Sequence, residues 1–472
     1  MMKKITFAFC CCMLFINDLA QACSAVVLKD GTKVFLAKNF DWTFREGMLI
    51  KNPRGVEKIA YFTHTGHQAR WTSKYGSVTF NQNGKEMPYG GMNEKGLVVE
   101  MLWMDFSRYN IGEERAYVNE LEWIQYQLDN YTSVKEVVEQ LDGLKVYPIK
   151  AKIHYILTDA SGESVIIEYL NGKAMAYQKE ANTCQAITNN SVVQSEPYKN
   201  QIQGIRKSTT APSYRYYLLE QEILALPGNK ELNSSLAFDM LRKVTIPQGD
   251  FKTMWSIVYD VQGKRISFFT DAQKEIRSID LASLDFGQVL QYADLNTGQP
   301  LRLEALSEAI NQKYVGASLM HLGFEDAVTK DIAQHQYSMK TAVSSVFSNQ
   351  YFHFEIFAPL EEERQTGFLA VMDSEQNFQD RKAVAGGYLY GNIARGTMVF
   401  HIYGLKNGRY ALLSFIDQNK NRKLDFSRDG KALEKYASFA DRSFSKSGDL
   451  NFASTSADFS RANARVTISW RQ

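Results

Sequence analysis

The residue whose type and position most clearly suggest a chemical role is Cys23, which follows an Ala-Gln-Ala triplet in "DLAQACSAVVLKDG". Before it lie a short basic end and the apolar stretch "ITFAFCCCMLFI", which is too short to span a bilayer comfortably. Ala20 and Ala22 place small side chains at the two positions that signal peptidase favours. We therefore expect residues 1–22 to be a signal peptide and the exported chain to begin at Cys23. An uncleaved anchor or a buried helix is the alternative.

A cysteine at a new N-terminus carries a thiol and a free α-amine on one Cα. The thiolate is a strong nucleophile, and an α-amine with an ordinary pKa of about 7.7–8.0 accepts the thiol proton near neutral pH. The amine later returns a proton to the leaving group. No catalytic histidine is needed, and the seven histidines form no cluster in the sequence. His64 and His67 in "HTGH" have a metal-like spacing without a third ligand, so we interpret them as loop residues.

Two other chemistries stay open for Cys23. Lipidation would acylate both its thiol and its amine and give a lipid-anchored binding protein without this activity. Ala20 and Gln21 match the lipidation signal poorly. The other chemistry is a structural disulfide with Cys184, since three of the five cysteines lie in the leader. So few cysteines in an exported chain argue against a fold built on disulfides.

The composition predicts a large apolar core and no strong electrostatic partner. Hydrophobic residues make up 44% of the chain, and the formal net charge is +2. No basic block indicates nucleic-acid binding, and no stretch after the leader is long enough to span a membrane. The roughly 450 residues after the leader exceed one ordinary domain, so we expect two domains.

Periodic patterns divide the chain between about residues 335 and 350. Before this point, "SAVVLKDGTKVFLAKNFDW" and "KIHYILTDASGESVIIEYLNGKAMAY" are typical of β-hairpins. Helical periodicity occurs in "NELEWIQYQLDNY", "SVKEVVEQL", "SYRYYLLEQEILAL" and "SSLAFDMLRKV", and Ser133 and Glu136 form a capping box. This mixture indicates an α+β layered domain over residues 23–335. Residues 350–472 read as strand after strand with turns between, which predicts a small all-β sandwich.

Five blocks of the first domain, in order, resemble the choloylglycine hydrolases, the family of bile salt hydrolases, penicillin V acylases and related linear-amide hydrolases. The blocks are "CSAVVLKDGTKVFLAKNFDW", "YGGMNEKGLVVEML", "KIHYILTDASGESVIIEYLNGK", "AITNNS" and "APSYRYY". The resemblance covers about residues 23–330 and implies the four-layer αββα sandwich of N-terminal nucleophile hydrolases. It also implies hydrolysis of an amide that joins a hydrophobic acyl group to a small polar amine, with no cofactor required. Conjugated bile salts, penicillin V and N-acyl homoserine lactones are such amides.

The resemblance assigns roles to four residues. Cys23 would be nucleophile and base, and Asp41 would hold the terminal amine. Asn189 would donate its side-chain amide to the oxyanion, and Arg215 would favour the thiolate. An amide is a suitable neutral oxyanion donor, and a guanidinium stays charged when desolvated. Each also has a structural interpretation, as a turn residue or a solvated helix charge, and Asn190 offers a register one residue later.

Two positions depart from the family pattern. Lys38 stands where the family usually has arginine, which keeps the charge but loses the planar fork. Trp103 stands where bile salt hydrolases typically have the asparagine of the second oxyanion position, so its backbone N–H would have to serve. With Trp42 it would line an apolar wall for an acyl or phenyl group, although both also suit core packing.

The aromatic residue at position 103 resembles the Gram-negative branch of the family. This implies a periplasmic or secreted protein of a Gram-negative bacterium that acts on a small-molecule amide. It leans slightly towards acyl-lactone or penicillin-type amides over bile salts. Because relatives are often tetrameric, the resemblance also allows a homo-oligomer.

The second predicted domain contains a loop with oxygen ligands. In "LLSFIDQNKNRKLDF", Asp417, Asn419, Asn421 and Asp425 have a spacing that suits Ca²⁺, although the loop lacks the glycine and the bidentate glutamate of an EF-hand. An Asx-rich β-turn is the alternative. Residues 350–472 resemble exported bacterial β-sandwich domains of the DUF2141 type, which implies a fold and no activity. Attachment to a surface or partner, or shaping of the entrance to the first domain's site, both remain open.

Overall fold

The computed structural model describes residues 23–338 and 351–467 with internal gaps. The gaps are residues 62–67, 110–114, 147, 149–150, 180–182, 204–206, 227–230, 250, 288, 299, 322–325, 360–365, 381–382, 391–396, 407, 417–423, 430, 439–450 and 460–464. The predicted signal peptide, His64 and His67 therefore lie outside the described residues. Within the described ranges, no helix is both long and apolar enough to cross a membrane.

The first of two large sheets contains Cys23 at the start of β1. Its six antiparallel strands are, in spatial order, β14 (Gln185–Ile187), β1 (Cys23–Asp30), β2 (Lys33–Trp42), β15 (Lys252–Asp260), β16 (Arg265–Thr270) and β17 (Arg277–Asp280). β1 and β2 form the predicted hairpin, and Gly31 in its turn has a φ of +57°, which glycine adopts without strain. The hairpin register places Cys23 opposite Phe40, so it brings Cys23 and Asp41 together.

The second large sheet lies against the first. Its nine strands are β13 (Lys173–Lys179), β12 (Ser164–Leu170), β11 (Ile153–Thr158), β8 (Val98–Trp103), β7 (Pro88–Asn93), β6 (Ser77–Asn81), β3 (Met48–Asn52), β18 (Gln291–Asp294) and β19 (Glu304–Ala305). Two small strand pairs accompany it, β4 (Glu57–Ile59) with β5 (Arg70–Thr72) and β9 (Tyr117–Val118) with β10 (Lys145–Val146). Apolar residues of both sheets, among them Leu36, Phe40 and Phe80, form one buried cluster.

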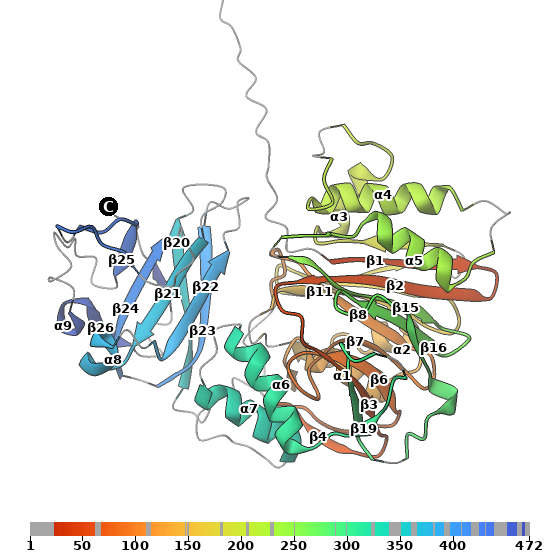
Figure 1. Ribbon diagram of the computed structural model, residues 1–472, viewed down its shortest axis with the longest axis horizontal. Helices are drawn as coiled ribbons and strands as arrows, with labels where there is room; N and C mark the ends of the chain where they lie inside the picture. Colours follow the sequence, from red (N-terminus) through yellow and green to blue (C-terminus); the bar gives the residue numbers. More distant parts are fainter. Residues whose placement is uncertain are drawn as a thin grey trace, which may run out of the picture.

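Helices complete the four layers (Figure 1). α4 (Pro212–Leu224) and α5 (Ser234–Lys243) cover the first sheet through a cluster that includes Leu219 and Phe238. α1 (Glu122–Asn130) and α2 (Val134–Glu139) cover the second sheet, and α2 begins with the predicted capping box of Ser133 and Glu136. The short helices are α3 (Val192–Ser195) and the 3₁₀ turns Glu196–Tyr198 and Leu281–Ser283. The predicted αββα sandwich is confirmed.

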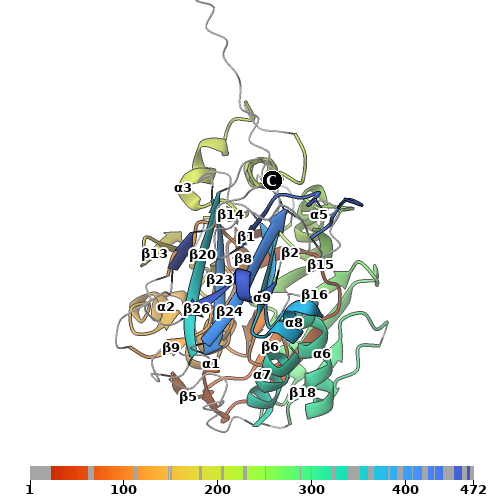
Figure 2. The same cartoon turned by 90° about the vertical axis from the view of Figure 1, so that its left-hand side faces the viewer.

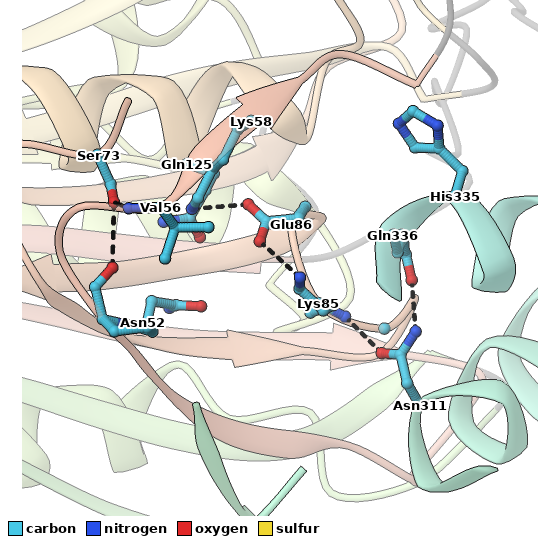
Figure 3. Close-up of polar contacts among 12 residues, drawn as sticks. Asn52, Val56, Lys58, Ser73, Lys85, Glu86, Gln125, Asn311, His335 and Gln336 are labelled. Carbon is cyan, nitrogen blue, oxygen red and sulfur yellow. Dashed lines mark hydrogen bonds and ion pairs between the residues drawn. The ribbon is translucent and has the colours of Figure 1, made fainter. Parts of the chain in front are cut away.

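A helical hairpin follows the last strand of the second sheet. It consists of α6 (Glu308–His321) and α7 (Asp326–Ser338), so α7 extends past the predicted domain boundary at residue 335. It makes several polar contacts with the loop of residues 82–87. Figure 3 shows Glu86 between Lys58 and Lys85, with Asn311 of α6 bound to Lys85 and to Gln336 of α7.

The C-terminal strands form two sheets, as a sandwich requires. The first has the order β23 (Thr397–Lys406), β20 (Tyr351–Pro359), β27 (Arg465–Thr467). The second has the order β22 (Ala385–Tyr390), β21 (Thr366–Met372), β24 (Gly408–Ile416), β25 (Tyr436–Ser438), with β26 (Ser456–Phe459) also paired to β24. Two short helices, α8 (Glu375–Gln379) and α9 (Phe452–Thr455), accompany them. Figure 2 shows β20, β23, β24 and β26 facing the viewer.

Candidate active site

Cys23 is buried where β1 begins, and only 3% of its surface is exposed. Its backbone nitrogen donates to Oδ1 of Asn189 at 3.0 Å. Its Sγ lies 3.9 Å from the backbone carbonyl oxygen of Asp41. Residues from the ends of β1, β2 and β14 therefore meet at one point, because antiparallel pairing aligns these strand ends.

Asn189 and Arg215 hold the backbone of Cys23. Arg215 projects from α4 and is fully buried. Its Nη1 donates to the carbonyl oxygen of Cys23 at 2.5 Å and to Oγ of Ser24 at 2.7 Å, and its Nη2 donates to Oδ1 of Asn189 at 2.8 Å. Two donors thus converge on Oδ1 of Asn189, which fixes the orientation of the amide. Asn190 instead binds Oγ of Ser213, so the structure places Asn189, not its neighbour, beside Cys23.

Asp41 contributes a buried carboxylate whose hydrogen bonds are incomplete. Its Oδ1 accepts from the hydroxyl of Thr253, the residue opposite it on β15. Its Oδ2 is buried and has no hydrogen-bond partner among the described residues. Burial raises the pKa of this carboxyl from 3.8 to about 7, while Arg215 and the Thr253 hydroxyl act to lower it. A buried carboxylate oxygen without a partner can accept a hydrogen bond from one more donor.

Lys38 belongs to a buried polar group between the two sheets. Its Nζ lies 2.5 Å from Oε2 of Glu100 on β8, and Oε1 of Glu100 accepts from the Tyr259 hydroxyl at 2.6 Å. Gly90, opposite Glu100 on β7, makes space for this carboxylate, since a Cβ there would lie 2.1 Å from it. A single ammonium suits one carboxylate oxygen, so the position does not require the planar fork of arginine.

The two tryptophans singled out from the sequence contact each other. The rings of Trp42 and Trp103 lie 5.9 Å apart between centroids, and both side chains are half-buried. The carbonyl oxygen of Trp103 accepts from Nδ2 of Asn189 at 2.9 Å. Trp103 therefore joins an aromatic surface to the polar group around Cys23, at the end of β8.

The first part of the chain is similar to known amide hydrolases. Residues 23–214 match the sequence model of the linear amide C–N hydrolases, choloylglycine hydrolase family. Over these residues the N-terminal domain is similar to the choloylglycine hydrolase family. It is an amidohydrolase domain that acts on linear amides.

Two relatives of this amidohydrolase domain have the same name. The penicillin V acylase of Pectobacterium atrosepticum is 27% identical over 264 residues, which are 47% of this chain and 70% of that protein. The solved structure of penicillin V acylase from Agrobacterium tumefaciens is 26% identical, with a TM-score of 0.51, and the match covers 60% of this chain and all of that chain. Separately, residues 360–467 match the uncharacterised bacterial family DUF2141.

The environment of the Cys23 thiol favours its protonated form. Burial raises the pKa of the Cys23 thiol from 9.0 to about 11. The charge of Lys38 is the largest effect that lowers it, Asp41 raises it further, and Arg215 lowers it less. A base is therefore needed to form the thiolate at neutral pH.

The disulfide alternative for this cysteine is wrong. Cys23 and Cys184 are both free thiols. Sγ of Cys184 instead accepts from the backbone nitrogen of Lys29 at 3.3 Å. Because Lys29 lies six residues along β1 from Cys23, the two sulfurs are about 20 Å apart, far beyond disulfide geometry.

The metal predictions fall largely on residues outside the described ranges. Asp417, Asn419 and Asn421 are not described, and Asp425 alone is placed. No group of three potential metal ligands occurs among the described residues. The calcium loop stays a prediction.

Sequence reasoning missed Thr253, Glu100 and Tyr259. Nothing in "FKTMWS" distinguishes the hydroxyl of Thr253 from that of any strand threonine. Glu100 left a signal, since it is one acid inside the apolar run "LVVEMLW". A charged residue in a fully buried strand is rarely tolerated without a buried partner.

Proposed function

We propose that the exported chain begins at Cys23 and that the Cys23 thiol is the nucleophile of this hydrolase. The observation that carries the proposal is the hydrogen bond from the backbone nitrogen of Cys23 to Oδ1 of Asn189, next to the buried Asp41. A free α-ammonium has three hydrogens, and Oδ1 of Asn189 already accepts from this nitrogen at 3.0 Å. In this proposal the Oδ2 of Asp41, which has no partner among the described residues, is the second acceptor for the ammonium.

In this proposal the α-amine is the base that the buried thiol requires. The thiol has a pKa of about 11, whereas an α-amine ordinarily titrates near 7.7–8.0. The neutral amine takes the thiol proton, the sulfur attacks the amide carbonyl, and the resulting ammonium protonates the leaving amine. Water, activated by the same amine, then releases the acyl group from the thioester. No cofactor takes part in these steps.

The oxyanion donors are Nδ2 of Asn189 and the backbone N–H of Trp103. Nδ2 carries two hydrogens and gives one to the Trp103 carbonyl, so the second is available for the oxyanion. The backbone N–H of Met104 donates to the carbonyl oxygen of Lys152 at 2.8 Å, on the side of β11. Along an antiparallel strand, the N–H and C=O groups of successive residues point alternately to one side and the other. The N–H of Trp103 is therefore directed away from β11, on the side of its carbonyl and Asn189.

The aromatic surface suggests the acyl side of the substrate. Trp42 contacts both Trp103 and Phe251, with ring centroids 5.9 Å and 6.1 Å apart, and such a wall suits a phenyl or alkyl acyl group. Both named relatives are penicillin V acylases. We therefore favour phenoxyacetyl penicillins or N-acyl homoserine lactones over conjugated bile salts, with action in the periplasm or outside the cell.

The test combines chemical characterisation of the mature chain with a substrate panel. Edman degradation and intact mass must show Cys23 as the first residue without acyl chains; a heavier, blocked chain would support the lipid-anchored alternative. The panel contains penicillin V, acyl homoserine lactones of several chain lengths, and glycine- and taurine-conjugated bile salts. We expect hydrolysis that Cys23→Ser lowers by at least about 10³-fold, as expected for loss of a covalent nucleophile.

Cys184→Ser is the matched control, because it removes the other described thiol at a distance from the site. It leaves turnover unchanged if Cys23 is the nucleophile. Undiminished hydrolysis by Cys23→Ser would refute the mechanism.

A further inference from the structure

A histidine and a glutamate that the mechanism does not use contact the backbone next to Asn189. His154 on β11 and Glu168 on β12 belong to a block that resembled the family, and both are completely buried. The register of β11 and β12 pairs Tyr155 with Ile167, so His154 and Glu168 are cross-strand neighbours. Their Nδ1 and Oε1 atoms lie 3.2 Å apart.

This His154–Glu168 dyad holds the backbone on both sides of Asn189. Nε2 of His154 lies 2.8 Å from the carbonyl oxygen of Thr188, and because a carbonyl only accepts, Nε2 carries the hydrogen. Oε1 of Glu168 accepts from the backbone nitrogen of Val192, the first residue of α3, at 2.8 Å. One contact therefore precedes Asn189 by one residue, and the other follows it by three.

The dyad also connects the two sheets at the site. His154 lies opposite Leu102 on β8, next to Trp103, whereas Thr188 directly follows β14 of the first sheet. Stacked sheets lie about 10 Å apart, and a histidine is long enough to cross from one inner face to a strand end of the other. The contact fixes the turn that carries Asn189 relative to the strand that carries Trp103.

We propose that the His154–Glu168 dyad positions Asn189 as an oxyanion donor. The proposal rests on the proposed function. The amide of Asn189 is only two bonds from its Cα, so a shift of the turn moves the donor by a similar amount. Misplacement by about 1 Å costs up to roughly 10²-fold in rate. The dyad acts through Asn189 and makes no contact with the reacting atoms.

A purely stabilising role explains the dyad less well. Oε2 of Glu168 is buried without a hydrogen-bond partner among the described residues, and such a group costs about 1–3 kcal/mol. Buried ion pairs add little net stability compared with apolar residues of the same volume. The hydrogen bonds to two backbone groups around one functional side chain are what an apolar pair could not supply.

The first test is a matched pair of substitutions at each end of the turn. His154→Gln keeps a donor near the Nε2 position, whereas His154→Asn keeps a polar group near Nδ1 and loses that donor. Val192→Pro removes the N–H that Glu168 binds, and the first helical position tolerates proline; Val192→Ala keeps the N–H. We expect His154→Asn and Val192→Pro to lower kcat by roughly 10–100-fold with KM nearly unchanged, because the lost interaction is made in the transition state.

The conservative partners, His154→Gln and Val192→Ala, should retain kcat within about 3-fold, since each keeps its hydrogen bond. Thermal unfolding verifies that the variants are folded. Val192→Pro leaves the buried dyad intact, so it provides the answer if His154→Asn does not fold. Equal kcat for the two members of either pair would overturn the proposal.

The second test asks whether the dyad acts through Asn189. Asn189→Ala should lower kcat by roughly 10²–10³-fold as an oxyanion donor. Adding Val192→Pro to Asn189→Ala should then lower kcat by less than about 2-fold, because the residue that the dyad positions has lost its amide. Multiplicative losses would assign the dyad a role independent of Asn189 and overturn the inference alone. A fully active Asn189→Ala would instead contradict the proposed function.

Discussion

Asp41 is the residue whose protonation state responds most directly to the proposed removal of the leader. Burial raises its pKa from 3.8 to about 7. Between about pH 4 and pH 7 the folded chain therefore binds a proton that the unfolded chain has released. The free energy of unfolding falls as pH rises through this interval, by at most about 4 kcal/mol for a shift of this size.

Asp41→Asn should remove this pH dependence in a chain whose Cys23 amine is blocked by a preceding residue. The variant then gains stability relative to its parent at pH 8 and gains little at pH 4. In a chain that begins at Cys23, the positive α-amine lies beside Asp41 and lowers its pKa, so the gain at pH 8 shrinks. Urea midpoints measured by tryptophan fluorescence compare the four chains. An identical gain in blocked and free chains would show that amine and carboxylate do not interact.

The residues of the site differ in how far the sequence could reveal them. Cys23 was identifiable from the leader, whereas Asp41 was assigned through the family resemblance. The predicted hairpin of β1 and β2 is what brings Asp41 to Cys23. Thr253 was not, because its contact with Asp41 depends on the pairing of β2 with β15, across more than 200 residues of chain. Glu100 was detectable as a buried acid, but its partners Lys38 and Tyr259 come from the other sheet.

At the scale of elements, the α6–α7 hairpin is a polar clamp on the loop of residues 82–87. Asn311 accepts from the backbone nitrogen of Lys85 at 2.8 Å and donates to Gln336 at 3.0 Å. Gln336 in turn donates to the carbonyl of Asn83 at 2.7 Å. Gly84 lies beneath these side chains with a φ of +80°, where a Cβ would lie 2.2 Å from Oε1 of Gln336. The loop leads into β7 and Tyr89, whose carbonyl lies 3.4 Å from Nζ of Lys38.

Asn311→Ala should lower the free energy of unfolding by about 2–4 kcal/mol, because it leaves a buried backbone N–H and a buried amide unsatisfied. Gly84→Ala should cost at least as much, since it combines the clash with an unfavourable left-handed backbone. Gln312→Ala, at the neighbouring exposed position of α6, is the control and should change stability by less than about 0.5 kcal/mol. Urea unfolding provides the measurement. Equal effects of Asn311→Ala and Gln312→Ala would contradict the clamp.

Elements whose local signals agree with their packing were predictable, and this hairpin was not. The β1–β2 turn and the capping box of α2 are encoded by adjacent residues. On α6, however, the buried face includes Asn311 and Ser318, so the helix lacks the continuous apolar stripe that indicates a packed helix. Its inner face mixes these polar residues with the apolar residues Val315 and Leu319, because part of its partner is a loop with backbone groups that need hydrogen bonds.

At the scale of the whole molecule, the candidate site lies within the two large sheets, α4 and the turn after β14 that carries Asn189. Its outermost contributors along the chain are Cys23 and Tyr259. The clamp extends this part of the chain to Gln336, and the strands that match DUF2141 begin beyond it. The sequence therefore separates into a part that carries the amide chemistry and a part that contributes no described residue to it.

Two truncations test this division. A chain ended at residue 345 keeps α7 and should retain kcat/KM within about 2-fold, because every contact described at the site is preserved. A chain ended at residue 325 loses Gln336 and His335. His335 lies 3.1 Å from the carbonyl oxygen of Ile59, and Gln336 donates to the carbonyl of Asn83. We therefore expect the thermal midpoint of this chain to fall by several degrees. Its loss of activity should follow its loss of structure. If the chain that ends at residue 345 is stable yet inactive, the C-terminal strands take part in substrate binding, and the amidase cannot be assigned to the first domain alone.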